Sequence, residues 1–500
     1  MSGGHGGQAA RTGQRPSTLS AADFGAAFKG FLEQAVAQAP AQEPFFRQRL
    51  RAHFGQDPTT LPIVAEEFDP SDHANVQRAV DAFLEGPERT AELLGVLSDQ
   101  QRYMGLKLTD LLAPARPGLW GGAPPMEGPV EYANVRLHDD QVLPCVKSGL
   151  YLVRETAAGA AAGRLAVYLR GPLEQGYPRR VRVEVMAPVR AAAERFLADL
   201  RTALRTRNVY RGHVLALSLD EMRQLQVHFR TLPRIAREDI ILPAGVLERI
   251  ERQTIGFARH RAALLRAGRH LKRGLLLHGP PGTGKTLTAM YLASRLRDRT
   301  VLLLTGRGLG LIERSCQMAR LLQPSMVVLE DVDLVAEERT RPDAACGPLL
   351  FELLNEMDGL AEDADVIFLL TTNRPDLLEP ALAARPGRVD LAIELPLPDA
   401  ACRRRLLDLY GRGLILPVAD LDGLVRRTEG VSAAFIKELL RKAALFAADE
   451  GDERGDSEER DGRFVLARRH LEEALHELLI HGGELTRSLL GARRPAQAAA

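Results

Sequence analysis

The residue types best suited to chemistry lie in one glycine-rich stretch of the chain. Its order is Gly279-Pro280-Pro281-Gly282-Thr283-Gly284-Lys285-Thr286, which fits the phosphate-loop pattern G-x-x-x-x-G-K-[ST] without a gap. Glycines let backbone N–H groups turn inward around a phosphate. Lys285 is expected to reach the β- and γ-phosphates, and the Thr286 hydroxyl to bind Mg²⁺. This stretch therefore predicts a nucleoside triphosphate site.

Both flanks of the loop suit this interpretation. Residues 274–278 are apolar enough for a short buried strand, and residues 287–296 have the spacing of a helix. A helix N-terminus adds partial positive charge beside a bound phosphate. The alternative is a Gly/Pro-rich turn that matches by chance, and the two flanks argue against it.

Further polar residues follow two other apolar runs. Residues 325–329 end in Glu330 and Asp331, and residues 366–372 end in Asn373. Carboxylates at the end of a strand can hold Mg²⁺ and activate water. The amide of Asn373 could orient that water. At this distance after the loop, the acidic pair predicts a second element of the same site.

Two arginines, Arg385 and Arg388, flank a Pro-Gly turn. Arginine offers a planar fork and a permanent charge, which suits contact with a phosphate held by a neighbouring subunit.

Together these stretches resemble the AAA family of the AAA+ ATPases. The resemblance covers roughly residues 238–480, and the first 235 residues match no family. Besides the phosphate loop, the stretches that carry it are Glu330-Asp331-Val332-Asp333, Leu353-Leu354-Asn355-Glu356-Met357-Asp358-Gly359-Leu360, Thr371-Thr372-Asn373-Arg374-Pro375, Arg385-Pro386-Gly387-Arg388 and Thr428-Glu429-Gly430-Val431-Ser432-Ala433-Ala434-Phe435-Ile436.

The resemblance implies an α/β P-loop NTPase fold, with a parallel sheet between helices and a helical C-terminal lid. It implies ATP and Mg²⁺ as cofactors and a homo-oligomeric ring, usually a hexamer. The expected catalytic residues are Glu330 at the metal-water position, Asp331 as base, Asn373 as first sensor, and Arg385 and Arg388 as trans-acting arginine fingers. The expected metal ligands are Thr286, Glu330 and Asp331. The expected nucleotide-binding residues are Gly279, Pro280, Pro281, Gly282, Thr283, Gly284, Lys285, Thr286, Leu287, Asp239, Ile240, Ala433 and Ala434.

Three departures from the family pattern bear on mechanism. The acids stand in the order Glu330-Asp331, whereas the family usually has Asp then Glu. The base carboxylate is therefore about one methylene further from the water, and slow hydrolysis is plausible. Ala433 replaces the usual glycine of the lid motif. The stretch at residues 306–310, which corresponds to the family's pore loop, has no aromatic residue.

A chain of 500 residues predicts about three domains at ~150 residues each. The apolar spacing and the Pro/Gly clusters suggest the following division: a disordered tail at 1–22, a helical N-terminal domain at 23–112, a Pro/Gly linker at 113–129, an α+β domain at 130–235, the ATPase large subdomain at 238–400, a helical lid subdomain at 401–485 and a tail at 486–500.

The bulk composition limits the classes of partner. A net charge of +1 argues against a dominant nucleic-acid or membrane surface. Four widely spaced cysteines predict reduced thiols and a cytoplasmic protein. No apolar run approaches the ~20 residues of a membrane helix. We therefore expect no membrane contact. The same near-neutral charge argues against nucleic acid as a partner, although arginines cluster between residues 179 and 211.

One segment near the C-terminus is similar to a zinc-protease helix. Its histidines, His476 and His481, are five residues apart. They diverge by about 140° at 3.6 residues per turn, whereas a zinc pair four apart shares a face. This spacing argues against a protease centre.

The leading hypothesis is an ATP hydrolase whose ring remodels or unfolds a protein client. The alternative is a nucleotide-dependent switch or assembly scaffold with slow turnover, favoured by the Glu330-Asp331 order and the absent pore aromatic. The sequence does not name the client.

Overall fold

In a computed structural model, the protein folds into two compact units. The first gathers residues from within 1–68, 84–133 and 146–197, and the second those from within 69–83, 134–145 and 198–500. The chain therefore passes between the units several times. The structure describes residues 20–38, 43–98, 105–114, 124–138, 140–156, 163–173, 179–305, 310–333, 349–359, 364–376, 378, 389–416, 421–454, 459–460 and 463–478.

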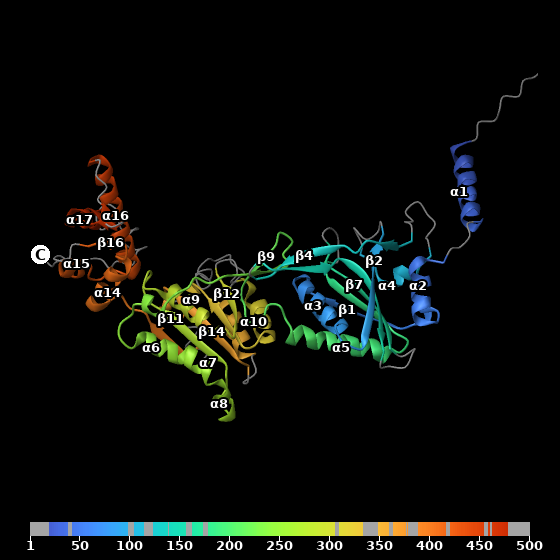
Figure 1. The fold of residues 1–500 in the computed structure, drawn as a ribbon, viewed down its shortest axis with the longest axis horizontal. Coiled ribbons are helices and arrows are strands. Elements are labelled where there is room, and N and C mark those ends of the chain that lie inside the picture. Colours follow the sequence, from blue (N-terminus) through green and yellow to red (C-terminus); the bar gives the residue numbers. More distant parts are fainter. Residues whose placement is uncertain are drawn as a thin grey trace, which may run out of the picture. The chain divides into compact units, whose positions relative to one another are not determined.

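The first unit is built on a six-stranded antiparallel sheet (Figure 1). The strand order is β1-β8-β7-β6-β2-β3. Helices α2 (Phe45–Phe54) and α4 (Leu108–Leu112) pack on it through Phe46, Leu50 and Leu108. Helix α1 (Ala21–Gln38) comes before α2 in the chain. The strands are β1 (Ile63–Phe68), β2 (Arg89–Leu97), β3 (Met126–Gly128), β6 (Ser148–Glu155), β7 (Arg164–Arg170) and β8 (Val181–Met186).

This sheet corrects the predicted division of the N-terminal half. The expected helical domain at 23–112 is wrong, because it contributes β1 and β2 to the sheet. These strands pair with β8 and β6, which lie in the expected separate domain at 130–235. The expected linker at 113–129 contains β3, and its residues 115–123 lie outside the described residues. Strand β1 is only six residues long and contains two adjacent glutamates, so its sequence pattern is weak.

The second unit is built on a seven-stranded sheet in the order β10-β9-β12-β13-β14-β11-β15. Neighbouring strands are parallel, except that β9 and β10 form an antiparallel hairpin. The strands are β9 (Val214–Leu219), β10 (Leu225–Phe229), β11 (Arg273–His278), β12 (Thr300–Leu304), β13 (Ser325–Leu329), β14 (Val366–Thr372) and β15 (Leu391–Glu394).

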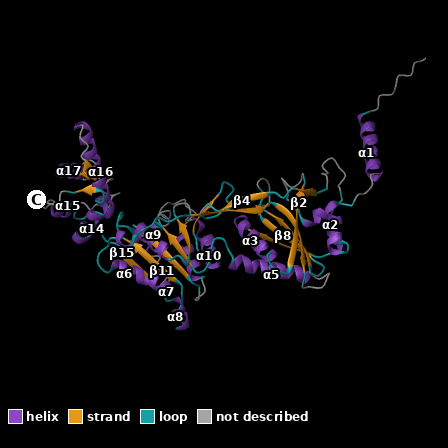
Figure 2. Cartoon of the chain, in the orientation of Figure 1, coloured by secondary structure: helices purple, strands orange, loops and turns teal. Residues whose placement is uncertain are grey.

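Helices cover both faces of this sheet (Figures 1 and 2). Successive residues of a strand point to opposite faces, so Val327 and Val328 of β13 enter two different cores. Because both faces are buried, the central strands are apolar throughout. One face is covered by α10 (Ile312–Leu321) and α12 (Leu349–Asp358), and the other by α6 (Val246–Glu251), α7 (Phe257–Arg259) and α9 (Lys285–Arg295). Between α6 and α7 lies the π-helical stretch Arg252–Gly256, and α8 (Arg261–Arg266) follows α7. The predicted parallel sheet between helices is confirmed.

The β9–β10 hairpin corrects a domain boundary. Its strands lie within the expected α+β domain at 130–235, yet β9 pairs with β12 of the large sheet. This sheet therefore begins near residue 214 rather than after 238. The remaining elements before it are α3 (His73–Leu84), the two-stranded pair β4 (Tyr132–Arg136) and β5 (Val142–Val146), and α5 (Arg190–Thr206).

The C-terminal segment is mainly helical, with a core around Phe435, Ile436 and Leu439. A small three-stranded sheet, which the sequence did not predict, accompanies the helices. Helix α16 continues to Arg454, which lies within the charged run at 449–461. No helix in the described part of the chain is long and apolar enough to span a membrane. The elements are α14 (Ala400–Tyr410), β16 (Leu414–Ile415), α15 (Leu421–Arg427), α16 (Ala433–Arg454), β17 (Glu459–Arg460), β18 (Arg463–Val465) and α17 (Arg468–His476).

Candidate nucleotide site

The glycine-rich loop joins β11 to α9, as the sequence predicts. Gly279, Gly282 and Gly284 have φ angles of 145°, 75° and 97°, which favour glycine. A Cβ atom on Gly279 would also overlap the carbonyl oxygen of Leu395. The loop thus depends on glycine for its backbone conformation and for close packing.

Lys285 is the first residue of α9, and its side chain is turned onto the loop. Its Nζ donates hydrogen bonds to the carbonyl oxygens of Gly279 (2.9 Å) and Pro280 (2.8 Å). Burial lowers the pKa of Lys285 to about 8, although the charges of Asp331 and Asp333 oppose the shift. A phosphate oxygen is a stronger partner than a neutral carbonyl because the hydrogen bond is then assisted by charge on both sides.

Glu330 follows β13 and lies beside the Thr286 hydroxyl. Burial raises the pKa of Glu330, a hydrogen bond from Thr286 lowers it, and the charge of Asp331 raises it. Its Oε1 atom is buried and has no hydrogen-bond partner among the residues that the structure describes. Mg²⁺ is bound by carboxylate and hydroxyl oxygens. The orphaned oxygen and the neighbouring hydroxyl therefore fit such a cation.

Asp331 contacts the predicted sensor directly. The Nδ2 of Asn373, just after β14, donates to Asp331 Oδ1 at 3.3 Å. The backbone N–H of Asp331 donates to Thr371 Oγ1 at 3.1 Å. Asp331 has a φ of 51°, a region that Asp enters more readily than most residues. The structure thus brings together the predicted base and the predicted amide.

Three further residues expected to bind the nucleotide are Asp239, Ile240 and Leu287. Ile240 is buried in the core beside the sheet. The carboxylate of Asp239 accepts a hydrogen bond from the Ala236 N–H (3.1 Å) and pairs with Arg412 at 3.5 Å. Its side chain is therefore engaged in holding the local turn. Leu287 is exposed on α9.

The start of helix α16 contacts the phosphate loop. The N–H of Ala434 donates to the carbonyl oxygen of Gly282 at 3.1 Å. A Cβ on Gly282 would lie 2.6 Å from Ser432 Oγ and 2.8 Å from Ala434 Cβ. Ala433 is the first residue of α16, so both predicted alanines are at this junction.

Several predicted features lie outside the described residues. These are Arg385, Arg388, the stretch 306–309 and His481. Conversely, Asp333 has no role predicted from the sequence, although its buried carboxylate contacts the Asn373 backbone. Its position two residues after Asp331 in the same acidic run was the available signal.

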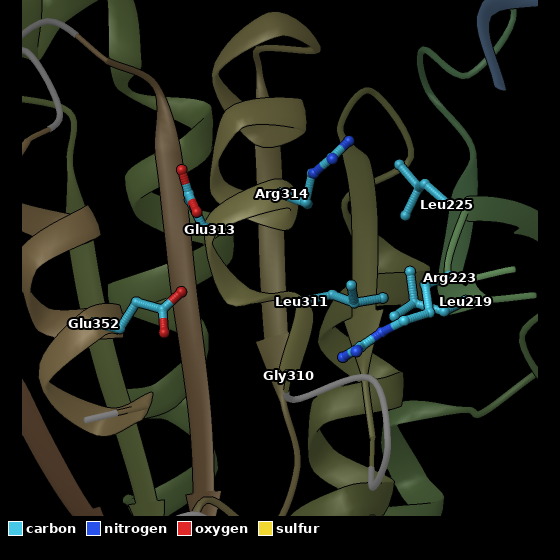
Figure 3. Close-up of a pocket in the computed structure, with 8 residues that line it drawn as sticks. All are labelled: Leu219, Arg223, Leu225, Gly310, Leu311, Glu313, Arg314 and Glu352. Carbon is cyan, nitrogen blue, oxygen red and sulfur yellow. The ribbon is translucent and has the colours of Figure 1, made fainter. Parts of the chain in front are cut away.

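A separate hollow of about 260 Å³ lies where the β9–β10 turn meets the start of α10. Figure 3 shows that Arg223, Leu219 and Leu225 come from the hairpin, whereas Leu311 and Arg314 come from the chain around the start of α10. None of the phosphate-loop residues lines this hollow. It is therefore not the predicted nucleotide site.

Comparison with known proteins agrees with the site. Residues 275–397 match the model of the "ATPase family associated with various cellular activities (AAA)". That segment contains the phosphate loop, β13 with its acids and β14 with Asn373.

Three relatives show how far the similarity extends. The ATP-dependent zinc metalloprotease FtsH of Rhodococcus erythropolis is 33% identical over 258 residues, which cover 48% of this chain and 29% of that protein. The proteasome-activating nucleotidase of Methanothermobacter thermautotrophicus is 37% identical over 195 residues, covering 36% and 47%. The 26S proteasome regulatory subunit S10B homolog B of Arabidopsis thaliana is 34% identical over 196 residues, covering 37% and 49%.

The chain thus spans less than half the length of each of these relatives. The family model matches the part of the chain that holds the nucleotide site. Residues 275–397 of this chain form a domain of the AAA family of ATPases.

Proposed function

We propose that the second unit hydrolyses ATP to ADP and phosphate. One observation carries this proposal: Lys285, the Glu330–Thr286 pair and the Asp331–Asn373 pair follow three adjacent parallel strands, β11, β13 and β14. The carboxyl ends of parallel strands meet at one edge of the sheet, where open α/β folds bind ligands.

Each of these residues has a distinct task. With ATP bound, Lys285 would exchange its carbonyl partners for phosphate oxygens, and Thr286 and Glu330 would hold Mg²⁺. When bound, the cation offsets the negative charge of the phosphates. Asp331 accepts a proton from the attacking water. Asn373 holds Asp331 in place and orients that water.

We further propose that the chain works as a ring, usually of six copies, that acts on a protein client in the cytoplasm. The names of the relatives support this: one is an ATP-dependent protease, and two are named for the proteasome. Arg385 and Arg388 of one subunit complete the site of its neighbour. The first unit selects the client.

The alternative is a nucleotide-dependent switch or scaffold with slow turnover. The specific observation in its favour is Asp331, a short carboxylate at the base position. In the exchanged variant Glu330→Asp/Asp331→Glu, a switch should gain turnover sharply. Unchanged or lower turnover counts against the switch.

The hydrolase proposal is tested by measuring Mg²⁺-dependent phosphate release from ATP. Lys285→Ala should abolish release, because the loop then lacks its only phosphate-directed cation. The matched control is Lys442→Ala, which removes a lysine that pairs with Glu477 in the C-terminal segment. Absence of turnover in the wild type, or unchanged turnover in Lys285→Ala, contradicts the proposal.

A further inference from the structure

Asp333 is a buried acid to which the proposed mechanism gives no task. It is 7% exposed. No Lys, Arg or His forms an ion pair with it in the part of the chain that the structure describes. A buried carboxylate is costly unless hydrogen bonds satisfy it. The groups that donate hydrogen bonds to Asp333 therefore indicate what its carboxylate holds in place.

Within the described residues, Asp333 accepts two hydrogen bonds, and both come from Thr372 and Asn373 at the end of β14. Thr372 Oγ1 donates to Asp333 Oδ1 at 2.8 Å, and the backbone N–H of Asn373 donates to the same oxygen at 3.2 Å. The Thr372 hydroxyl in turn accepts a hydrogen bond from the N–H of Arg374 at 2.9 Å. The turn after β14 is thus folded around one carboxylate oxygen. Hydrogen bonds to an ionised acceptor are stronger than those between neutral groups.

This turn sets the position of the Asn373 side chain. Its Nδ2 atom reaches Asp331 Oδ1 at 3.3 Å. Two acids from the end of β13 therefore hold one asparagine from the end of β14. Asp333 holds its backbone and Asp331 holds its amide. Asp333 fixes the backbone from which the predicted sensor extends.

We propose that Asp333 is a positioning residue for ATP hydrolysis, which acts through Asn373. This inference rests on the proposed function. Asp333 positions Asn373 and does not itself contact the nucleotide. Its loss should therefore lower kcat and leave the affinity for ATP nearly unchanged. Misplacement of a catalytic group by about 1 Å can cost on the order of 10²-fold in rate.

The kinetic test compares three variants of the full chain. Asp333→Ala removes the acceptor, and we expect kcat to fall about 10- to 100-fold with KM for ATP changed less than about threefold. Asp333→Asn keeps an acceptor oxygen and should restore most of kcat. Glu356→Ala removes a partly buried acid that pairs with Arg320, away from the site, and should resemble the wild type. A wild-type kcat in Asp333→Ala, or failure of Asp333→Asn to restore it, overturns the proposal.

A double-variant cycle asks whether Asp333 acts through Asn373. If it does, Asp333→Ala should add little to the loss in Asn373→Ala. Losses that multiply would show that Asp333 acts by another route, and the proposal would then be wrong.

A third measurement does not depend on hydrolysis. In hydrogen–deuterium exchange, the Asn373 amide should exchange at least about tenfold faster in Asp333→Ala than in the wild type, because it loses its acceptor. Asp333→Asn should retain protection. Unchanged protection in Asp333→Ala contradicts the positioning role. Absence of wild-type ATP turnover would instead contradict the proposed function, so the two failures are distinguishable.

Discussion

Asp331 combines a proposed catalytic task with a backbone conformation that few side chains tolerate. Its φ of 51° lies in the left-handed region, where Asp and Asn are enriched several-fold over other non-glycine residues. The Thr371 hydroxyl accepts its N–H. The residue at this position must therefore satisfy a conformational demand as well as supply a carboxylate.

The variant Asp331→Asn separates these two demands. Asn tolerates the same φ, so we expect the free energy of unfolding to change by less than about 0.5 kcal/mol. It cannot accept a proton, so ATP turnover should fall about 10²- to 10⁴-fold, and the protein should retain bound ATP. Phosphate release and urea unfolding measure the two effects. Asp331→Ala is the comparison, and it should also lose about 1 kcal/mol of stability. More than a tenth of wild-type turnover in Asp331→Asn would exclude Asp331 as the base.

His53 supplies a second residue-scale prediction, in the first unit. Burial lowers its pKa to about 4, further lowered by Arg154 and Arg164 and opposed by a hydrogen bond to the Leu165 carbonyl. Between pH 6.5 and 4 the unfolded chain binds more protons than the folded one. The contribution of neutral His53 to the free energy of unfolding is therefore fully present above pH 6.5. It decreases as the pH falls, by about 2 kcal/mol between pH 7 and pH 5.

Hydrogen exchange of peptides from α2 and β7 at pH 7 and pH 5 measures this loss locally. His53→Gln keeps a neutral hydrogen-bond donor and should be less sensitive to acid than the wild type. Equal sensitivity in both proteins would show that His53 is not the group responsible.

At the residue scale, the sequence predicted the site most reliably where its geometry depends on residues that are neighbours in the chain. The phosphate loop is contiguous, and its φ angles and close contacts demand the glycines that make it recognisable. The role of Asp333 could not be predicted in this way. It depends on Thr372 and Asn373, which lie about 40 residues away and meet Asp333 only because β13 and β14 are adjacent.

At the scale of elements, the contact between the phosphate loop and α16 leads to a testable prediction. Gly282→Ala places a Cβ within 2.6 Å of Ser432 Oγ and 2.8 Å of Ala434 Cβ, at a φ of 75°. Either the loop or the start of α16 must shift. We expect ATP affinity to fall at least about tenfold and stability to fall by about 1–3 kcal/mol. Titration with a fluorescent ATP analogue and thermal unfolding measure these changes.

The matched control is Gly245→Ala. Gly245 has a φ of 82°, but its added Cβ would meet nothing within 4 Å. This variant should lose only about 1 kcal/mol of stability from backbone strain and should bind ATP normally. Normal ATP binding by Gly282→Ala would show that the contact with α16 does not shape the loop.

In the second unit, the sequence predicted which segments form helices and strands, but it did not always predict which strands pair with each other. The predictions for β13 and α9 agree with the structure. Helix α9 packs on the sheet that contains β13, and residues of both elements share one hydrophobic core. Strands β9 and β10 lie within the stretch that the sequence predicted as a separate α+β domain at 130–235. Their sheet is decided by the pairing of β9 with β12, a long-range contact that local periodicity does not encode.

At the scale of the whole molecule, the predicted domains are consecutive stretches of the chain, whereas the two observed units are each made of several separate stretches. Residues 69–83 and 134–145 belong to the second unit, although residues of the first unit flank them. For example, the Tyr210 hydroxyl donates to the carbonyl oxygen of Ser71 at 2.5 Å within the second unit. Composition marks linkers, but it does not show that a chain returns to an earlier unit.

The proposed ring leads to the final prediction, which concerns Arg385 and Lys285 in different subunits. If Arg385 completes the neighbour's site, Arg385→Ala and Lys285→Ala should each be inactive alone, yet a mixed ring should regain activity. Half of the subunits then have Lys285, and half of their neighbours have Arg385. Turnover should therefore reach about a quarter of the wild-type value at equal mixing.

Two affinity tags, one on each variant, allow mixed assemblies to be purified after co-expression and assayed for phosphate release. If Arg385 acted within its own subunit, every site in the mixed ring would lack either the lysine or the arginine, and no activity would return. Doubly tagged assemblies without turnover would thus exclude a trans-acting Arg385. Activity near a quarter would show that the catalytic unit is the interface between two copies, because neither variant chain contains a complete site.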